Sequence, residues 1–280
     1  MENYRRDDLI FDVRDAGPPD GPVVVLLHGF PQHNDSWNAV TDRLTAQGYR
    51  CLAPNQRGYS PGARPSRRRD YRMSELVADL GALIDASGGR RVHLVGHDWG
   101  AAVAWAAAAE MPERLATASP ISVPHPAAFI KSFATSRQGL ASWYMYFFQL
   151  PRIPEWLLMR RNGVIASESL RRGGQIPAAV ERDVQAMREP GAMTAALNWY
   201  RAIPLSDLRA SNEKISVPTM YVWSDRDIAL LPKAAHDTAR YVGGEYRFEI
   251  LPGVSHWIPD EQPDKLADLL LDWFAVHQAD

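Results

Sequence analysis

A tight turn between an apolar strand and a helix most restricts the folds open to this chain. Gly96-His97-Asp98-Trp99-Gly100 follows a short apolar run at Arg91–Val95 and precedes strong helix formers at Ala101–Glu110. Glycines at both ends of the turn let its backbone approach neighbouring elements without a clash at Cβ. The pattern therefore predicts a strand, a sharp turn and a helix, with a carboxylate at the apex of the turn.

Asp98 at this apex indicates one kind of chemistry. In turns of the same spacing with a serine at the apex, a base must deprotonate the serine before it attacks an acyl carbon. A carboxylate is already ionised at neutral pH and can displace a leaving group at an sp3 carbon. Epoxides and alkyl halides are therefore the expected substrates, and a plain helix-capping aspartate is the alternative.

Two more polar clusters follow predicted strands. Asp225 and Asp227 come after the apolar run Thr219–Trp223, and His256 comes after Tyr246–Leu251. A nucleophile, an acid and a histidine in this chain order, each just past a strand end, is the arrangement of hydrolase triads. Because the carboxyl ends of parallel strands share one edge of a sheet, we expect the three side chains to converge.

A candidate oxyanion site comes from the first apolar strand, Val23–Leu27, which is followed by His28-Gly29-Phe30-Pro31. The backbone N–H groups of Phe30 and Trp99 are predicted to face one oxygen atom. His28 is expected to have a structural role.

These motifs together resemble those of the epoxide hydrolase group of the α/β-hydrolase superfamily, over essentially the whole chain. The matching segments are HGFP at 28–31, RGYS at 57–60, GHDWG at 96–100, the acid loop at 225–227 and SHW at 255–257. The resemblance implies an α/β-hydrolase fold, with a mostly parallel central sheet flanked by helices and an inserted helical cap.

The sequence pattern places the boundaries of that insert. Apolar strands alternate with helical segments over the first 120 residues or so, which predicts a parallel sheet with crossover helices. An aromatic, helix-like stretch interrupted by Pro and Gly follows. We expect residues 1–125 and 212–280 to form the α/β-hydrolase core and residues 126–211 the cap.

The resemblance also implies roles for cap and loop residues. Tyr144 and Tyr200 match the two cap tyrosines that hold the epoxide oxygen in the family, with Tyr146 as the fallback for the first. Asp227 matches the triad acid because it lies four residues beyond Trp223, and Asp225 stays as its competitor.

The expected reaction has two halves. Asp98 attacks an epoxide carbon to form a covalent alkyl-enzyme ester, while the two tyrosines donate hydrogen bonds to the oxygen. His256 then activates a water that hydrolyses the ester, and the Phe30 and Trp99 amides hold the oxyanion. The product is a vicinal diol.

Three alternatives remain beside this interpretation. A haloalkane dehalogenase uses the same Asp, His and acid machinery but commonly has asparagine at the position of Phe30. A fluoroacetate-type dehalogenase would need arginines just after the nucleophile, where this chain has WGAAVAW at 99–105. A non-catalytic, ligand-binding relative would have lost a member of the triad.

Charge and hydrophobicity restrict the classes of partner that we expect for this chain. The formal net charge is −2, so the basic loop Arg64–Arg72 is a local feature, and we expect no nucleic acid partner. No apolar run approaches the ~20 residues of a membrane span, and Cys51 is the single cysteine. We expect a cytoplasmic enzyme that acts on a small apolar epoxide without a cofactor or metal ion; a homodimer is left open.

Overall fold

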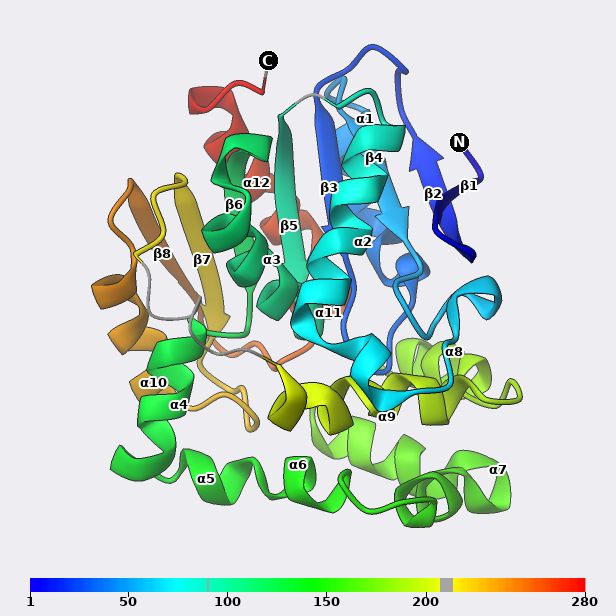
Figure 1. The fold of residues 1–280 in the computed structure, drawn as a ribbon. Helices are drawn as coiled ribbons and strands as arrows, with labels where there is room; N and C mark the ends of the chain where they lie inside the picture. Colours follow the sequence, from blue (N-terminus) through cyan, green and yellow to red (C-terminus); the bar gives the residue numbers. More distant parts are fainter. Residues whose placement is uncertain (90, 207–213, 280) are drawn as a thin grey trace.

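An eight-stranded sheet forms the centre of the molecule (Figure 1). The computed structural model describes residues 1–89, 91–206 and 214–279. The strand order is β1-β2-β4-β3-β5-β6-β7-β8; β1 and β2 are antiparallel additions, and all other neighbours pair in parallel. The strands are β1 (Asn3–Arg6), β2 (Leu9–Ala16), β3 (Val23–Leu27), β4 (Arg50–Pro54), β5 (Val92–His97), β6 (Leu115–Ile121), β7 (Thr219–Ser224) and β8 (Tyr246–Leu251).

Helices cover both faces of the sheet. Successive side chains of a strand point to opposite faces, and in β3 Val23 and Val25 pack with the core on one side while Val24 and Leu26 pack on the other. The first side holds α2 (Met73–Ala86) and α3 (Trp99–Glu110); the second holds α1 (Asn38–Thr45), α11 (Ile258–Glu261) and α12 (Pro263–Val276). The predicted α/β fold with a mostly parallel sheet is confirmed.

The chain between β6 and β7 forms a group of helices. They cover the end of the sheet at which β7 ends and α3 begins, in the lower part of Figure 1. The first begins at Pro126, and the predicted end of the cap at 211 lies outside the described residues. No helix in the described ranges is long and apolar enough to cross a membrane. These helices are α4 (Pro126–Thr135), α5 (Gln138–Ala141), α6 (Trp143–Phe147), α7 (Ile153–Arg172), α8 (Pro177–Ala186) and α9 (Ala192–Ala202).

Helix α9 joins these helices to the sheet. Its residues are buried except Thr194, and the Trp199 indole N–H donates a 2.7 Å hydrogen bond to the Arg57 carbonyl in the loop after β4. Two residues later, Arg201 forms an ion pair with Glu155 of α7 at 2.7 Å. The side chains of α9 are therefore fixed from both sides, which positions Tyr200.

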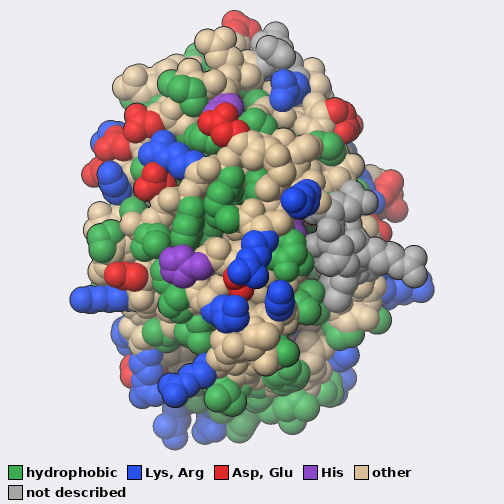
Figure 2. Space-filling model, turned by 90° about the vertical axis from the view of Figure 1, so that its left-hand side faces the viewer, with side chains coloured by type: hydrophobic (Ala, Val, Ile, Leu, Met, Phe, Trp, Pro, Cys, Tyr) green, Lys and Arg blue, Asp and Glu red, His purple; other side chains and the backbone are tan. Residues whose placement is uncertain are grey.

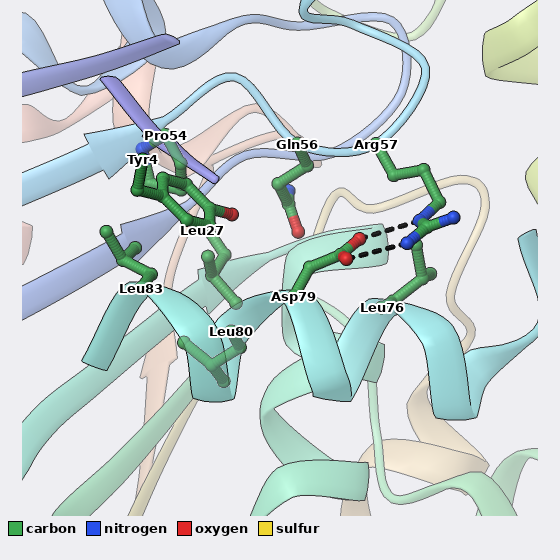
Figure 3. A pocket seen from close by; sticks show the side chains of 9 residues that line it. All are labelled: Tyr4, Leu27, Pro54, Gln56, Arg57, Leu76, Asp79, Leu80 and Leu83. Carbon is green, nitrogen blue, oxygen red and sulfur yellow. Dashed lines mark hydrogen bonds and ion pairs between the residues drawn. The ribbon is translucent and has the colours of Figure 1, made fainter. Parts of the chain in front are cut away.

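A buried ion-pair cluster supports the loop after β4 (Figure 3). The Arg57 guanidinium donates from Nε and Nη2 to the two carboxylate oxygens of Asp79 in α2, both at 2.7 Å, and Arg6 of β1 donates to the same carboxylate at 2.9 Å. Burial raises the pKa of Asp79 even though two guanidinium groups favour its charged form. The preceding residue, Gln56, donates from its side chain to the His28 carbonyl at 2.6 Å. The cluster thus holds the loop that supports the HGFP segment.

Breaking this cluster should destabilise the fold. Replacing Asp79 with Asn removes the nearer ionic partner of the buried Arg57 guanidinium and leaves only Glu75, 3.8 Å away. We expect a loss of about 3 kcal/mol in the free energy of unfolding, measured by urea denaturation. Glu168→Gln is the matched control because its partner, Arg172, is 77% exposed; this change should cost less than about 1 kcal/mol. Equal losses in the two variants would contradict a stabilising role for the buried cluster.

Candidate active site

Asp98 lies at the apex of the predicted turn. It is the N-cap of α3 and has φ of 52° and ψ of −118°, a conformation that an L-residue adopts only under strain. The turn also requires its glycines, because a Cβ on Gly96 would overlap the Gly100 carbonyl and a Cβ on Gly100 would overlap the Leu27 carbonyl. The chain therefore turns sharply enough to present the Asp98 side chain at the carboxyl end of β5.

Two groups face the two oxygens of the Asp98 carboxylate. The Phe30 amide donates to Oδ1 at 2.7 Å, and His256 Nε2 lies 3.5 Å from Oδ2. Burial opposes the charge, but His256, His97 and the Phe30 N–H outweigh it and lower the pKa of Asp98 below its usual value. Asp98 is therefore ionised at neutral pH. A Cβ on Gly29 would overlap this carboxylate, so the HGFP segment needs glycine at that position.

Asp227 is the acid that the fold brings to His256. His256 Nδ1 and Asp227 Oδ2 are 2.6 Å apart, and the Asp227 side chain is fully buried. Its other oxygen accepts hydrogen bonds from the backbone N–H groups of Ala229 and Leu230 at 2.8 and 2.9 Å. These bonds fix the carboxylate before any ligand binds.

Asp225, the competing acid, faces a different part of the chain. It accepts a 2.6 Å hydrogen bond from the Gly253 amide and so links the loops that follow β7 and β8. This contact gives Asp225 the role of a turn residue, which is common for aspartate.

His256 lies between the two buried carboxylates. Burial of its ring disfavours the charged form, but Asp227 and Asp98 together outweigh burial and raise the pKa of His256 to about 10. The imidazole is therefore protonated at neutral pH as long as both carboxylates carry their charge.

Two phenols lie within reach of the Asp98 charge, in a cluster of aromatic rings. The Tyr144 and Tyr200 ring centroids are 6.1 Å apart, and Tyr200 packs edge-on against Trp99 at 5.0 Å and Phe30 at 5.4 Å. Burial raises the pKa of both phenols, and the nearby Asp98 charge raises it further, so both hold their protons. Tyr146, the fallback for the first tyrosine, is 65% exposed on the outside of α6.

The other predicted backbone donor, Trp99, is the first residue of α3. Its N–H therefore belongs to the helix N-terminus, where the amide groups have no partner within the helix and the helix dipole favours negative charge. Of the two predicted donors, the Phe30 amide contacts the Asp98 carboxylate, and the Trp99 amide follows Asp98 directly in the chain. His28 is fully buried and uses its ring in contacts with Gly29 and Gln56.

Sequence reasoning missed a set of residues behind His256. The ring of His97 lies 2.8 Å from Gln32 Oε1 through Nδ1 and 2.9 Å from the His256 carbonyl through Nε2. Ser122 donates to the same carbonyl at 3.0 Å. His97 lies within the GHDWG motif and Gln32 directly follows the HGFP motif, and these positions were the available signal. These contacts fix the backbone that carries the His256 imidazole. Within the described ranges, no group of three or more His, Cys, Asp or Glu side chains could hold a metal ion.

Known proteins resemble this chain along most of its length. A family model described as the alpha/beta hydrolase fold matches residues 22–263. The AB hydrolase superfamily protein YfhM of Bacillus subtilis is 35% identical over 95% of this chain and 94% of that protein. Epoxide hydrolase A of Mycobacterium tuberculosis is 32% identical over 93% of this chain and 92% of its own length. The chain belongs to the epoxide hydrolase group of the α/β-hydrolase superfamily.

A solved structure of this hydrolase group has the same fold. Epoxide hydrolase VrEH1 from Vigna radiata superposes with a TM-score of 0.82 at 26% identity and covers 98% of both chains. The predicted family is therefore confirmed. The turn around Asp98 lies in a fold that this chain shares with these hydrolases.

The two acids of the loop after β7 should affect His256 differently. Asp227→Asn removes the main carboxylate that favours the imidazolium, so the pKa of His256 should fall from about 10 toward or below 6.5. Asp225→Asn is the matched control and should leave that pKa in place. An NMR titration of histidine-labelled protein measures both values, and equal shifts in the two variants would refute the assignment of Asp227 as the partner.

Proposed function

We propose that this protein is an epoxide hydrolase that converts an apolar epoxide to a vicinal diol through a covalent ester on Asp98. The observation that carries the proposal is an ionised carboxylate at a strained turn, with a histidine beside it and two protonated phenols near enough to feel its charge. Relatives at 32–33% identity that are named epoxide hydrolases support the same activity.

In the first half of the reaction, Asp98 opens the epoxide ring. The Phe30 amide holds Oδ1, which leaves Oδ2 to attack the epoxide carbon. A new C–O ester bond forms as the C–O bond of the ring breaks, and the released oxygen takes a proton from Tyr144 or Tyr200. The two phenols are suited to this step because they remain protonated beside the Asp98 charge.

Ester formation then changes His256 from an acid to a base. The alkylated Asp98 carries no charge, so only Asp227 still favours the imidazolium, while burial continues to oppose it. The pKa of His256 therefore falls when the ester forms, and the proton that the ring releases restores the phenol that protonated the epoxide oxygen. The free enzyme keeps His256 charged, and the intermediate prepares the neutral imidazole that the second half needs.

In the second half, water hydrolyses the ester. Neutral His256 takes a proton from a water molecule through Nε2, and the resulting hydroxide attacks Cγ of Asp98. The negative charge develops on Oδ1, which the Phe30 amide already contacts, with the Trp99 amide as second donor. Collapse of the tetrahedral intermediate breaks the bond between Cγ and the ester oxygen, and this oxygen takes the proton of the hydroxyl group that water left on Cγ. The diol leaves, and Asp98 is again a carboxylate beside a protonated His256.

The rings around the site favour an apolar epoxide over other alkyl electrophiles. Phe148 packs against Phe30 at 5.7 Å and against Tyr200 at 5.0 Å, so the surroundings of the phenols are aromatic. Two hydroxyl donors stabilise the alkoxide that develops when a ring C–O bond breaks, whereas Phe30 offers no side-chain donor to a departing halide.

Removing the phenols one at a time tests this function. Tyr144→Phe and Tyr200→Phe should each slow diol formation from styrene oxide by about 10- to 100-fold, because a hydrogen-bond donor to the developing alkoxide is lost. Tyr146→Phe is the matched control: it lies two residues from Tyr144 on the same helix and faces outward, so it should keep the parent rate. Chromatography of the diol measures all three.

A parallel assay with 1-bromohexane separates the proposal from a dehalogenase. The parent should form diol and release little bromide. Bromide release without diol, or parent rates in both inner tyrosine variants, would contradict the proposed reaction.

A further inference from the structure

The outer face of the cap exposes a row of large apolar side chains. We use the name cap face for Leu140, Trp143, Tyr146, Leu150, Ile153 and Trp156, which are between 43% and 77% exposed. They lie on α5, α6 and the first turns of α7, with Leu150 in the connection between α6 and α7, along the edge of the molecule farthest from the sheet (Figure 1). Soluble proteins rarely expose apolar side chains in one contiguous group unless the group contacts something.

Basic side chains surround this face. Arg137, Arg152, Arg160 and Arg161 are all exposed, and in the described part of the chain none of the four takes part in an ion pair. The nearby Glu155 does not balance them, because it is paired with the buried Arg201. Lys and Arg side chains are interspersed with hydrophobic ones along the lower edge of Figure 2, where the cap lies.

The charge of this region differs in sign from that of the whole chain. From residue 131 to residue 172 the sequence has seven Lys and Arg residues and two Glu residues, whereas the chain as a whole carries −2. Two copies that met through this face would bring positive charges together. An anionic partner is therefore favoured over a second copy of the chain.

The residue types on the cap face fit a lipid surface. Tryptophan and tyrosine are enriched where membranes meet water, and arginine reaches anionic headgroups while its stem stays on apolar surface. The Arg160 guanidinium lies over the Trp156 ring, 4.7 Å from its centroid, so one of these basic groups is already held at the apolar face. Short helices with this division of apolar and basic side chains lie in the plane of the membrane interface.

We propose that the cap face binds peripherally to an anionic lipid bilayer. The same helix, α6, presents Trp143 and Tyr146 outward and Tyr144 toward Tyr200. A bilayer in contact with the cap face would therefore lie one helix away from the proposed epoxide site, next to the phase in which apolar epoxides concentrate. This inference goes beyond the proposed function, and binding to lipid is measurable without any turnover.

Flotation with lipid vesicles tests the proposal on the full chain. We expect the protein to float with vesicles of phosphatidylcholine and phosphatidylglycerol mixed 7:3, and to stay behind with pure phosphatidylcholine. Binding should weaken in 0.5 M NaCl, because salt screens the contacts between arginine and the headgroups.

Paired variants separate the cap face from general surface properties. Arg137→Glu/Arg160→Glu should lower the partition coefficient by about fivefold for each basic side chain lost. The control Arg67→Glu/Arg68→Glu makes the same charge change in the exposed basic loop. It should lower the partition coefficient far less. Leu140→Ser/Trp143→Ser should lower it by about tenfold or more.

The matched control for the apolar pair is Ile250→Ser/Val276→Ser, which removes exposed apolar side chains from β8 and α12 and should bind vesicles like the parent. Failure of the parent to float with anionic vesicles would overturn the proposal. Equal losses in the cap-face and control variants would also overturn it. A parent dimer that dissociates in Leu140→Ser/Trp143→Ser without lipid would assign the face to a second copy instead.

Discussion

The backbone at Asp98 passes from β5 into α3 in a strained conformation with positive φ, and most of the site depends on this turn. The turn can form only because Gly96 and Gly100 bring the backbone into close contact with its neighbours. It places the carboxylate beside the Phe30 amide and opposite His256, at the edge where the parallel strands end. The sheet supplies the rigidity that holds this strain, because β3, β5 and β6 are central and paired on both sides.

Two buried carboxylates acting on one imidazole then give the site its chemistry. Asp227 and Asp98 raise the pKa of His256 against the effect of burial, so loss of the charge on Asp98 lowers that pKa. In the proposed reaction, formation of the ester removes that charge. Asp98 thus serves as the nucleophile, and its change of charge also lowers the pKa of the histidine that acts as the base.

The sequence was most informative where structure is local. The strand Val23–Leu27 and the turn around Asp98 were predicted because their apolar runs and glycine spacing are contained in a few residues. The choice of Tyr144 over Tyr146 was left open, because six consecutive residues from 143 to 148 are aromatic or Met and only packing against α9 decides which of them faces inward. The bond between His97 and the His256 carbonyl joins residues 159 positions apart, so it depends on the tertiary fold and no local pattern predicts it.

The central claim is that Asp98 becomes covalently alkylated and that His256 is needed only to release the product. Intact-protein mass spectrometry of the His256→Gln variant mixed with styrene oxide tests it most directly. The account predicts a stable adduct with the full mass of the epoxide, mapped to Asp98 by peptide analysis and missing from the Asp98→Asn/His256→Gln double variant. No adduct on the single variant, with an epoxide that the parent converts to diol, would contradict the covalent mechanism.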